Sequence, residues 1–235
     1  MKRVKLVVAY DGTNYCGWQV QKNGETIESV LNRAIGELTG EEIHVMGSSR
    51  TDAGVHACGN VAVFDTEARM AADKFSYALN QRLPEDIRIQ DSCEVPADFH
   101  PRFQKTVKTY EYRILNREFP LPAYRFNSHF TYRKLDVERM RQAAAYLIGE
   151  HDFQSFCAAG AQVKTTVRTI YALDVEKQGD LIIIRITGNG FLYNMVRIIA
   201  GTLMKIGQGD WEPECIPEIL AGCDRQLAGP TAPAR

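Results

Sequence analysis

The first half of the chain is organised around one stretch, Gly47-Ser48-Ser49-Arg50-Thr51-Asp52-Ala53-Gly54-Val55-His56-Ala57. Apolar segments at 43–46 and 61–64 flank it and are typical of strands, so the sequence predicts a loop between two strands. Gly47 and Gly54 bracket the charged residues and permit sharp turns of the backbone. Loops held between strands often carry functional side chains, and this loop is therefore the first candidate site.

The surrounding pattern predicts the rest of the first half. An apolar, β-branched run indicates a strand over 4–10, and apolar residues at helical spacing indicate a helix over 27–38 that ends at Gly40. A second helix is expected over 75–83, where Pro84 closes it, and an alternating strand over 87–95. The order is therefore strand, helix, strand, strand, helix, strand.

The second half repeats this mixture of antiparallel strands and helices. The pattern predicts a strand over 106–115, a connection over 117–134, a helix over 137–148, a hairpin of 166–175 with 181–187, a helix over 192–206 and a short helix near 216–220. We expect an α+β fold of two similar subdomains, 1–104 with the loop 47–57 and 105–235. Helices would pack on each antiparallel sheet, and the active-site cleft would lie between the subdomains.

Composition narrows the class of protein. The 235 residues are 45% hydrophobic and 24% charged, with a formal net charge of −1, which is ordinary for a soluble globular protein. The six cysteines show neither a C-x-x-C motif nor paired Cys/His spacing, which argues against a zinc site and a disulfide scaffold. Reduced thiols favour a cytoplasmic protein. No stretch approaches the ~20 apolar residues that a membrane span requires.

Positive charge is concentrated between Pro101 and Ala143. Ten basic residues stand there against four acids, a local charge of +6. Such a zone indicates either a phosphate-binding face or an ordinary solvated surface, and composition leaves both open. The basic residues are Arg102, Lys105, Lys108, Arg113, Arg117, Arg125, Arg133, Lys134, Arg139 and Arg141.

Arg50 and Asp52 are the residues of the loop that suit chemistry best. They stand two positions apart, so they can share one edge of the loop, and an arginine beside an aspartate keeps the carboxylate ionised at neutral pH. An ionised, positioned carboxylate serves as a nucleophile or a base. The alternative is a structural turn in which Asp52 caps local amides and Arg50 is a surface partner.

The string Arg50-Thr51-Asp52-Ala53-Gly54-Val55-His56 resembles the signature of the tRNA pseudouridine synthase A family. The resemblance implies that Asp52 is the catalytic carboxylate. It also implies that Arg50 helps to displace the target base and pairs with phosphate or with the aspartate. His56 would have a structural or RNA-contacting role.

Five further blocks resemble the same family, and the first three named here stand in the family's order. They are Tyr10–Gln19, Lys108–Arg113, Gly188–Arg197, Gly149–Phe156 and Ala228–Ala234. The resemblance implies that Tyr110 stacks on the target uracil and that Arg197 pairs with the catalytic aspartate. Without the resemblance, Tyr110 would be interpreted as a packing residue on a strand, and Arg197 would be interpreted as a charge on an amphipathic helix. Family members usually continue into a closing strand, whereas this sequence stops at Arg235.

The resemblance implies a tRNA pseudouridine synthase that converts uridine at positions 38, 39 and 40 of the anticodon stem-loop. The uracil would leave C1′ through N1 and rejoin it through C5, without cofactor or metal. The sequence agrees, because it holds neither a Rossmann glycine fingerprint nor a P-loop. The expected partners are tRNA and a second copy of the chain in a homodimer.

Two other classes of protein could carry the same loop residues. One is a non-catalytic tRNA- or RNA-binding protein on the same fold, and the presence of Asp52, Arg50, Tyr110 and Arg197 together argues against it. The other is a small-molecule enzyme with Asp52 as general base, for which His56 is the nearby titratable partner.

Overall fold

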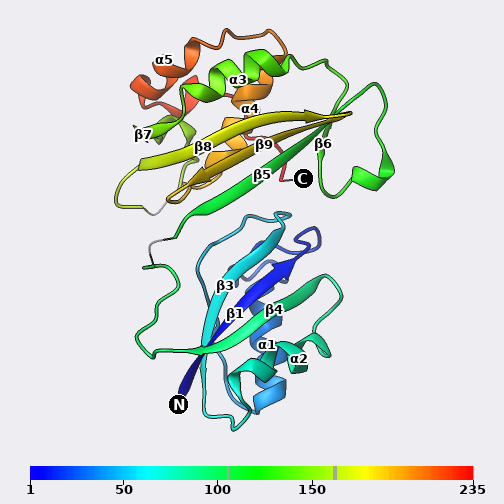
Figure 1. The fold of residues 1–235 in the computed structure, drawn as a ribbon, viewed down its shortest axis with the longest axis vertical. Coiled ribbons are helices and arrows are strands. Elements are labelled where there is room, and N and C mark those ends of the chain that lie inside the picture. The colour runs from blue at the N-terminus through cyan, green and yellow to red at the C-terminus, as the bar shows by residue number, and fades with distance from the viewer. Residues whose placement is uncertain (105, 161–162, 235) are drawn as a thin grey trace. The chain divides into compact units, whose positions relative to one another are not determined.

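The computed structural model describes residues 1–104, 106–160 and 163–234. The chain divides into two compact units, Met1–Gln104 (unit 1) and Lys105–Arg235 (unit 2). Each unit has its own sheet, its own helices and its own hydrophobic core (Figure 1). In the described part of the chain, no helix has the length and hydrophobicity needed to cross a membrane.

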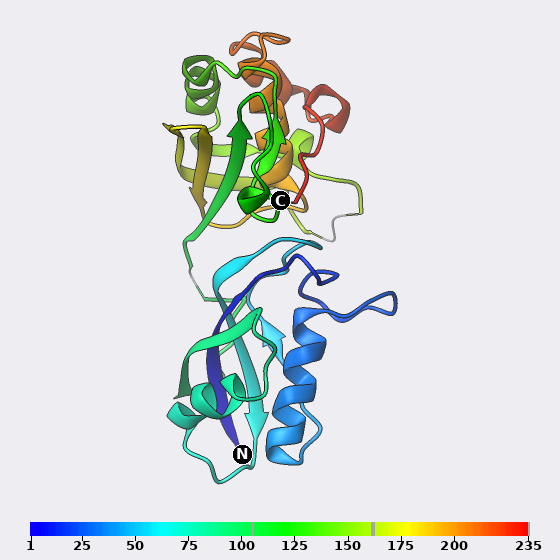
Figure 2. The ribbon, with the colours of Figure 1, turned by 90° about the vertical axis from the view of Figure 1, so that its right-hand side faces the viewer.

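Unit 1 is a four-stranded antiparallel sheet with helices on one face. The strand order is β2-β3-β1-β4, and Figure 2 shows α1 standing along the sheet. Its elements are β1 (Lys2–Tyr10), α1 (Ile27–Thr39), β2 (Met46–Gly47), β3 (Ala57–Thr66), the 3-10 turn η1 (Ala72–Lys74), α2 (Phe75–Asn80) and β4 (Ile87–Val95). The predicted order of strands and helices in this half is confirmed.

The core of unit 1 follows directly from the alternation of β1. Every second residue of that strand, from Val4 to Tyr10, is buried against the apolar faces of α1 and α2. The start of α1 is fixed by a capping box in which Thr26 and Ser29 bond each other's backbone amides. Gly40 ends it at φ +74, a conformation that glycine adopts without strain. The predicted helix 27–38 is thus confirmed.

Two predictions in unit 1 need correction. The strand expected over 43–46 is reduced to β2, because Asn32 of α1 accepts a hydrogen bond from the amide of Val45 at 2.8 Å and so takes the place of a strand partner. The helix expected over 75–83 ends at Asn80. The amides of Arg82 and Leu83 both bond the carbonyl of Leu79, which forms a tight turn before Pro84.

Unit 2 is a five-stranded sheet with the order β6-β5-β9-β8-β7. The β5–β6 pair is parallel and the other pairs are antiparallel. Its elements are β5 (Lys108–Asn116), η2 (Pro122–Tyr124), β6 (His129–Thr131), α3 (Val137–Ala145), β7 (Gly149–Asp152), η3 (Gln154–Phe156), β8 (Val167–Gln178), β9 (Leu181–Gly188), α4 (Met195–Gly207), α5 (Cys215–Gly222) and η4 (Arg225–Leu227). The predicted hairpin is confirmed as β8 and β9.

Helix α4 forms the centre of unit 2. Eleven of its thirteen residues are buried, which is typical of a helix enclosed on all sides rather than an amphipathic surface helix. It packs beside α3 and against β5, on the side of the sheet that carries Ile182, Ile184 and Ile186 (Figure 1). The predicted helix 192–206 starts instead at Met195, because Asn194 lies in the left-handed region at φ +59.

Two strands of unit 2 were not expected from the sequence. The connection predicted over 117–134 contains β6, which is held beside β5 because Asn116 donates hydrogen bonds from its side chain to the carbonyls of Thr131 and Arg133. The short strand β7 pairs with the start of β8. Both are only three or four residues long, which is too short for a clear period-two pattern.

The last described residues pack across α4. A Cβ at Gly201 would overlap with the carbonyl oxygen of Pro230, and Thr202 Oγ1 accepts a hydrogen bond from the amide of Gly229 at 2.9 Å. Arg225 donates to the carbonyl of Ala228 and to the hydroxyl of Thr231. The segment 228–234 is therefore fixed on the helix by backbone contacts.

We predict that Gly201→Ala destabilises the protein. Helix propensity alone would favour alanine by about 1 kcal/mol. The overlap with Pro230 instead displaces the segment 228–234, and the free energy of unfolding should fall by about 1–3 kcal/mol. Urea unfolding measures this. The control is Gly59→Ala, whose Cβ would lie at an ordinary 3.5 Å from Val7. An unchanged or raised stability of Gly201→Ala would contradict this account of the segment.

Candidate active site

The start of the loop 47–57 is fixed by one buried side chain, that of Asn60 on β3. Its Oδ1 accepts hydrogen bonds from the hydroxyl of Ser48 at 3.1 Å and the amide of Ser49 at 3.3 Å. Its Nδ2 donates to the carbonyl of Ser49 at 3.0 Å. A single asparagine thus satisfies three polar groups of the loop, so this part of the backbone has a defined course.

The segment 10–18, which follows β1, interlocks with the middle of the loop. The amide of Trp18 donates to the carbonyl of Thr51 at 3.1 Å, and the amide of Gly54 donates to the carbonyl of Tyr15 at 3.3 Å. The hydroxyl groups of Tyr10 and Thr51 share a hydrogen bond of 2.8 Å. Asp52 therefore lies between two residues whose backbones are both bonded to the segment 10–18.

Glycines make this close approach sterically feasible. A Cβ at Gly12 would overlap with the carbonyl of Val55, and one at Gly17 would lie 2.6 Å from the carbonyl of Thr51. Gly47, expected to provide a turn, has another role, because a Cβ there would overlap with the buried indole ring of Trp18. Gly54 does provide the predicted turn, at φ +80.

The two charged residues of the loop differ in exposure. The Asp52 side chain is half-buried, and its carbonyl accepts a hydrogen bond from the amide of Val55 at 3.1 Å. Arg50 is exposed. Its guanidinium is therefore accessible to a ligand.

His56 joins the end of the loop to the segment after β1. Its Nδ1 lies 3.2 Å from the amide nitrogen of Gly12 and 3.0 Å from Oδ1 of Asp11. It accepts from the amide when neutral and donates to the carboxylate when protonated. Partial burial works to raise the pKa of Asp11, but hydrogen bonds from Thr13 and the charge of His56 outweigh it and lower that pKa.

Tyr110 and Arg197 lie in unit 2 and are near each other. Tyr110 on β5 is half-buried against the core, two residues before the buried Tyr112, whose hydroxyl donates to the carbonyl of Pro233 at 3.0 Å. Burial is the main cause of a raised pKa at Tyr112, Tyr110 raises it further and the charge of Arg197 opposes both. Tyr112 and Arg197 bond the carbonyls of adjacent residues, Pro233 and Ala232, so their side chains reach the same part of the segment 228–234.

Arg197 is held in a defined direction in the first turn of α4. Its Nε donates to the carbonyl of Ala232 at 2.8 Å, and its Nη1 donates to Oδ1 of Asn194 at 2.9 Å. Its carbonyl in turn accepts the amide of Ala232 at 3.0 Å. The left-handed Asn194 and the segment 228–234 therefore act together on this one side chain.

Two of the four predicted site residues lie in each unit. Arg50 and Asp52 share a loop of unit 1, while Tyr110 and Arg197 share a region of unit 2. Sequence reasoning missed two supporting residues. Asn60 has no sequence signal, because nothing around it distinguishes it from any other strand residue. Asn194 stands inside the block 188–197, but its backbone conformation could not be read from that block.

The structure also qualifies the basic segment between Pro101 and Ala143. Five of its arginines form ion pairs, three of them with acids outside the segment, which lowers the excess of six positive charges to three. Lys105, one of the ten basic residues, lies outside the described residues. The five pairs are Arg113–Glu111, Arg117–Asp180, Arg133–Asp210, Arg139–Glu212 and Arg141–Glu138.

Comparison with known proteins gives one consistent family. A family model described as tRNA pseudouridine synthase matches residues 6–104 and 143–235. The chain is 49% identical over 234 residues to a protein of Acetivibrio thermocellus named tRNA pseudouridine synthase A, covering 100% of this chain and 96% of the relative. Proteins of the same name from Ruminiclostridium cellulolyticum and Brevibacillus brevis are each 50% identical over 236 residues, with the same coverage.

We predict that Tyr10→Phe loosens the loop 47–57 without disturbing the core. Burial raises the pKa of Tyr10 to about 12, so its hydroxyl stays protonated and able to bond Thr51 at neutral pH. Loss of that bond should cost about 1 kcal/mol of unfolding free energy. In a double-mutant cycle with Thr51→Val, the two losses should be less than additive. Additive losses would mean that the two hydroxyls do not interact.

Proposed function

The chain belongs to the tRNA pseudouridine synthase family and isomerises uridine to pseudouridine in tRNA, and we propose that Asp52 is its catalytic carboxylate. The observation that carries the proposal is the interlock that holds the backbone on both sides of Asp52, at Thr51 and at Gly54. A carboxylate on a preorganised loop needs no reordering before it acts, which is the condition for efficient catalysis.

The reaction exchanges one glycosidic bond for another. The bond between N1 of uracil and C1′ of the ribose breaks, the base turns, and a bond between C5 and C1′ forms while C5 loses its proton and N1 gains one. Asp52 takes part in this reaction in one of two ways. It attacks C1′ as a nucleophile, or it assists removal of the C2′ proton. Both routes need an ionised carboxylate close to the sugar.

Arg50 and Tyr110 act when the target uracil is flipped out of the RNA helix. A uridine stacked inside an RNA helix does not reach a protein carboxylate, so it must be flipped out at a cost of a few kcal/mol. Arg50 is exposed two residues before Asp52 and lies where it can steady the vacated space or a neighbouring phosphate. Tyr110 offers an aromatic face, the usual partner of an extruded base. Its side chain packs partly against the core of unit 2.

Arg197 acts on the carboxylate. We assign to it the pairing with Asp52 that keeps the aspartate ionised and aimed at the sugar. Its bonds to Ala232 and Asn194 support this role, because an arginine already held at Nε and Nη1 loses little conformational freedom when it pairs.

The substrate we propose is the anticodon stem-loop of tRNA, with uridines at positions 38, 39 and 40 as targets. One active site serves three adjacent positions only if it recognises the shape and backbone of the RNA more than the base sequence. The enzyme would work in the cytoplasm as a homodimer, with tRNA as its partner.

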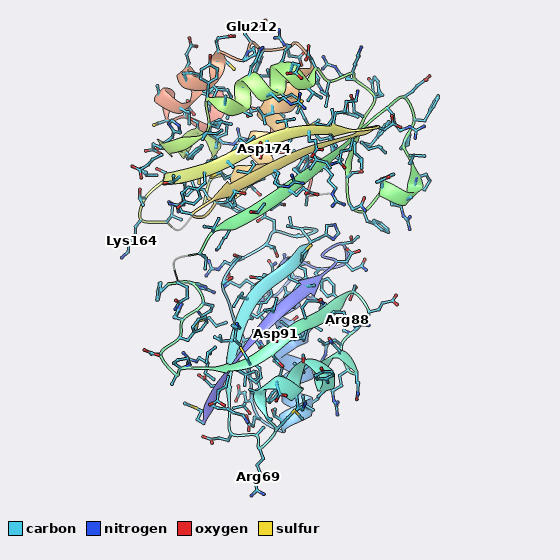
Figure 3. All side chains as sticks on the ribbon, in the orientation of Figure 1. Arg69, Arg88, Asp91, Lys164, Asp174 and Glu212 are labelled. Atoms are coloured by element: carbon cyan, nitrogen blue, oxygen red, sulfur yellow. The ribbon has the colours of Figure 1, made fainter. Side chains whose placement is uncertain are left out.

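We predict that Asp52→Asn abolishes pseudouridine formation on an unmodified tRNA transcript, by about 10³-fold or more, while tRNA binding is retained. Asparagine preserves the size of the side chain but neither attacks carbon nor accepts a proton. The matched control is Asp91→Asn, an exposed aspartate on β4 that Figure 3 labels. Substantial turnover in Asp52→Asn would contradict the proposal. A wild-type chain that binds tRNA tightly without forming product would favour a binding protein on the same fold.

The remaining positive charge of the segment between Pro101 and Ala143 would contact phosphates. With about three phosphates neutralised and a slope of roughly 0.9 per phosphate, raising salt from ~50 to ~200 mM should weaken tRNA binding about 40-fold. Filter binding across a salt series measures this. An affinity that does not change with salt would exclude a phosphate-binding role for the segment.

A further inference from the structure

The last turn of unit 1, residues 96–104, is fixed at its start to the sheet. Arg3 of β1 donates from Nη1 to the carbonyl of Phe99 at 3.0 Å, and the amide of Phe99 bonds the carbonyl of Pro96 at 2.9 Å. Pro101 is buried. The turn is therefore anchored on both sides of His100, so the backbone that leads to Arg102 and Phe103 has a defined course.

Arg102 places a positive charge at the start of the loop 47–57. Its Nε donates to the carbonyl of Gly47 at 2.9 Å, three residues before Arg50. The side chain forms no ion pair with any residue that the structure describes. Because a guanidinium has five N–H donors and this one uses only Nε, its two terminal nitrogens keep their donors for an anion.

The same turn presents an aromatic face. The rings of His100 and Phe103 stack with centroids 4.0 Å apart and planes inclined by 19°. Phe103 is 81% exposed, although one face of its ring is covered by the imidazole. His100 also accepts the amide of Arg102 at Nδ1 and the amide of Phe103 at its carbonyl, both at 3.2 Å. His100 thus contacts both Arg102 and Phe103, and the face of the Phe103 ring that points away from the imidazole is open.

We propose that Arg102 and Phe103 form a second RNA-binding element beside the catalytic loop. Arg102 binds a backbone phosphate of the strand that carries the target uridine, and Phe103 stacks on an unpaired base of the same RNA loop. A guanidinium next to an open aromatic face is the combination that single-stranded nucleic acid favours, since it matches a phosphate and a base together. The inference rests on the proposed function, because the ligand is the same tRNA.

A purely structural role for Arg102 is separable from phosphate binding. Arg102→Gln keeps an N–H donor that can reach the carbonyl of Gly47 but removes the charge, whereas Arg102→Lys keeps the charge. Phe103→Leu keeps apolar surface but removes the aromatic face. The matched control is Arg69→Gln, an exposed arginine of unit 1 that follows the far end of β3 and is labelled in Figure 3.

The test measures three quantities for each variant with an unmodified tRNA transcript. They are the Kd for tRNA, the slope of log K against log salt, and the single-turnover rate at saturating tRNA. Arg102→Gln should raise Kd by about tenfold and lower the slope by about one, with the saturated rate within about twofold of wild type. Arg102→Lys should restore most of the affinity and the slope. Phe103→Leu should raise Kd by about tenfold at an unchanged slope.

Two outcomes would overturn the inference. One is a wild-type Kd and slope in Arg102→Gln. The other is a fall in the saturated rate of Arg102→Gln with Kd and slope unchanged, which would mean that Arg102 only supports Gly47. Absence of product with the wild-type chain would instead count against the proposed function, and the binding measurements would still decide the role of Arg102 and Phe103.

Discussion

The bonds between the segment 10–18 and the loop 47–57 are the constraint on which the position of Asp52 depends. The carbonyls of Thr51 and Tyr15 accept amides from opposite segments, so each segment fixes the other. This contact is possible because Gly12 and Gly17 have no Cβ to separate the backbones. β1 holds the start of the segment 10–18, and the first residues of α1 bond its end at Gly17 and Trp18. The strands β2 and β3 hold the two ends of the loop 47–57.

Unit 2 also fixes the backbone that carries a functional side chain, that of Arg197, but it does so with a buried helix and a crossing segment. Arg197 stands on a helix that is buried almost all round, so that its backbone cannot move without disturbing the core. The segment 228–234 then crosses that helix at Gly201 and offers the carbonyl of Ala232 to the guanidinium. In both units hydrogen bonds and packing fix the backbone segment that carries the functional side chain, the loop 47–57 for Asp52 and α4 for Arg197. Such preorganisation is what charge stabilisation in catalysis requires.

Elements with a strong internal period could be predicted from the sequence, as α1, β4 and the β8–β9 hairpin show. Elements held by a single side-chain bond could not. Asn32 replaces a strand partner at Val45, and Asn116 holds β6 in place, yet neither asparagine stands out in the sequence. The site residues could be predicted because they stand in ordered motifs. The residues that hold the surrounding backbone or side chains, such as Asn60 and Asn194, could not, because their role depends on backbone geometry that no local sequence pattern shows.

If the bonds between the segment 10–18 and the loop 47–57 set the position of the catalytic carboxylate, Tyr10→Phe should slow the chemical step. The measurement is the single-turnover rate of pseudouridine formation at saturating tRNA, with the tRNA Kd determined in parallel. We expect the rate to fall by about tenfold or more at an unchanged Kd, because small displacements of a reacting group are costly. A wild-type rate in a variant of proven lower loop stability would contradict the claim.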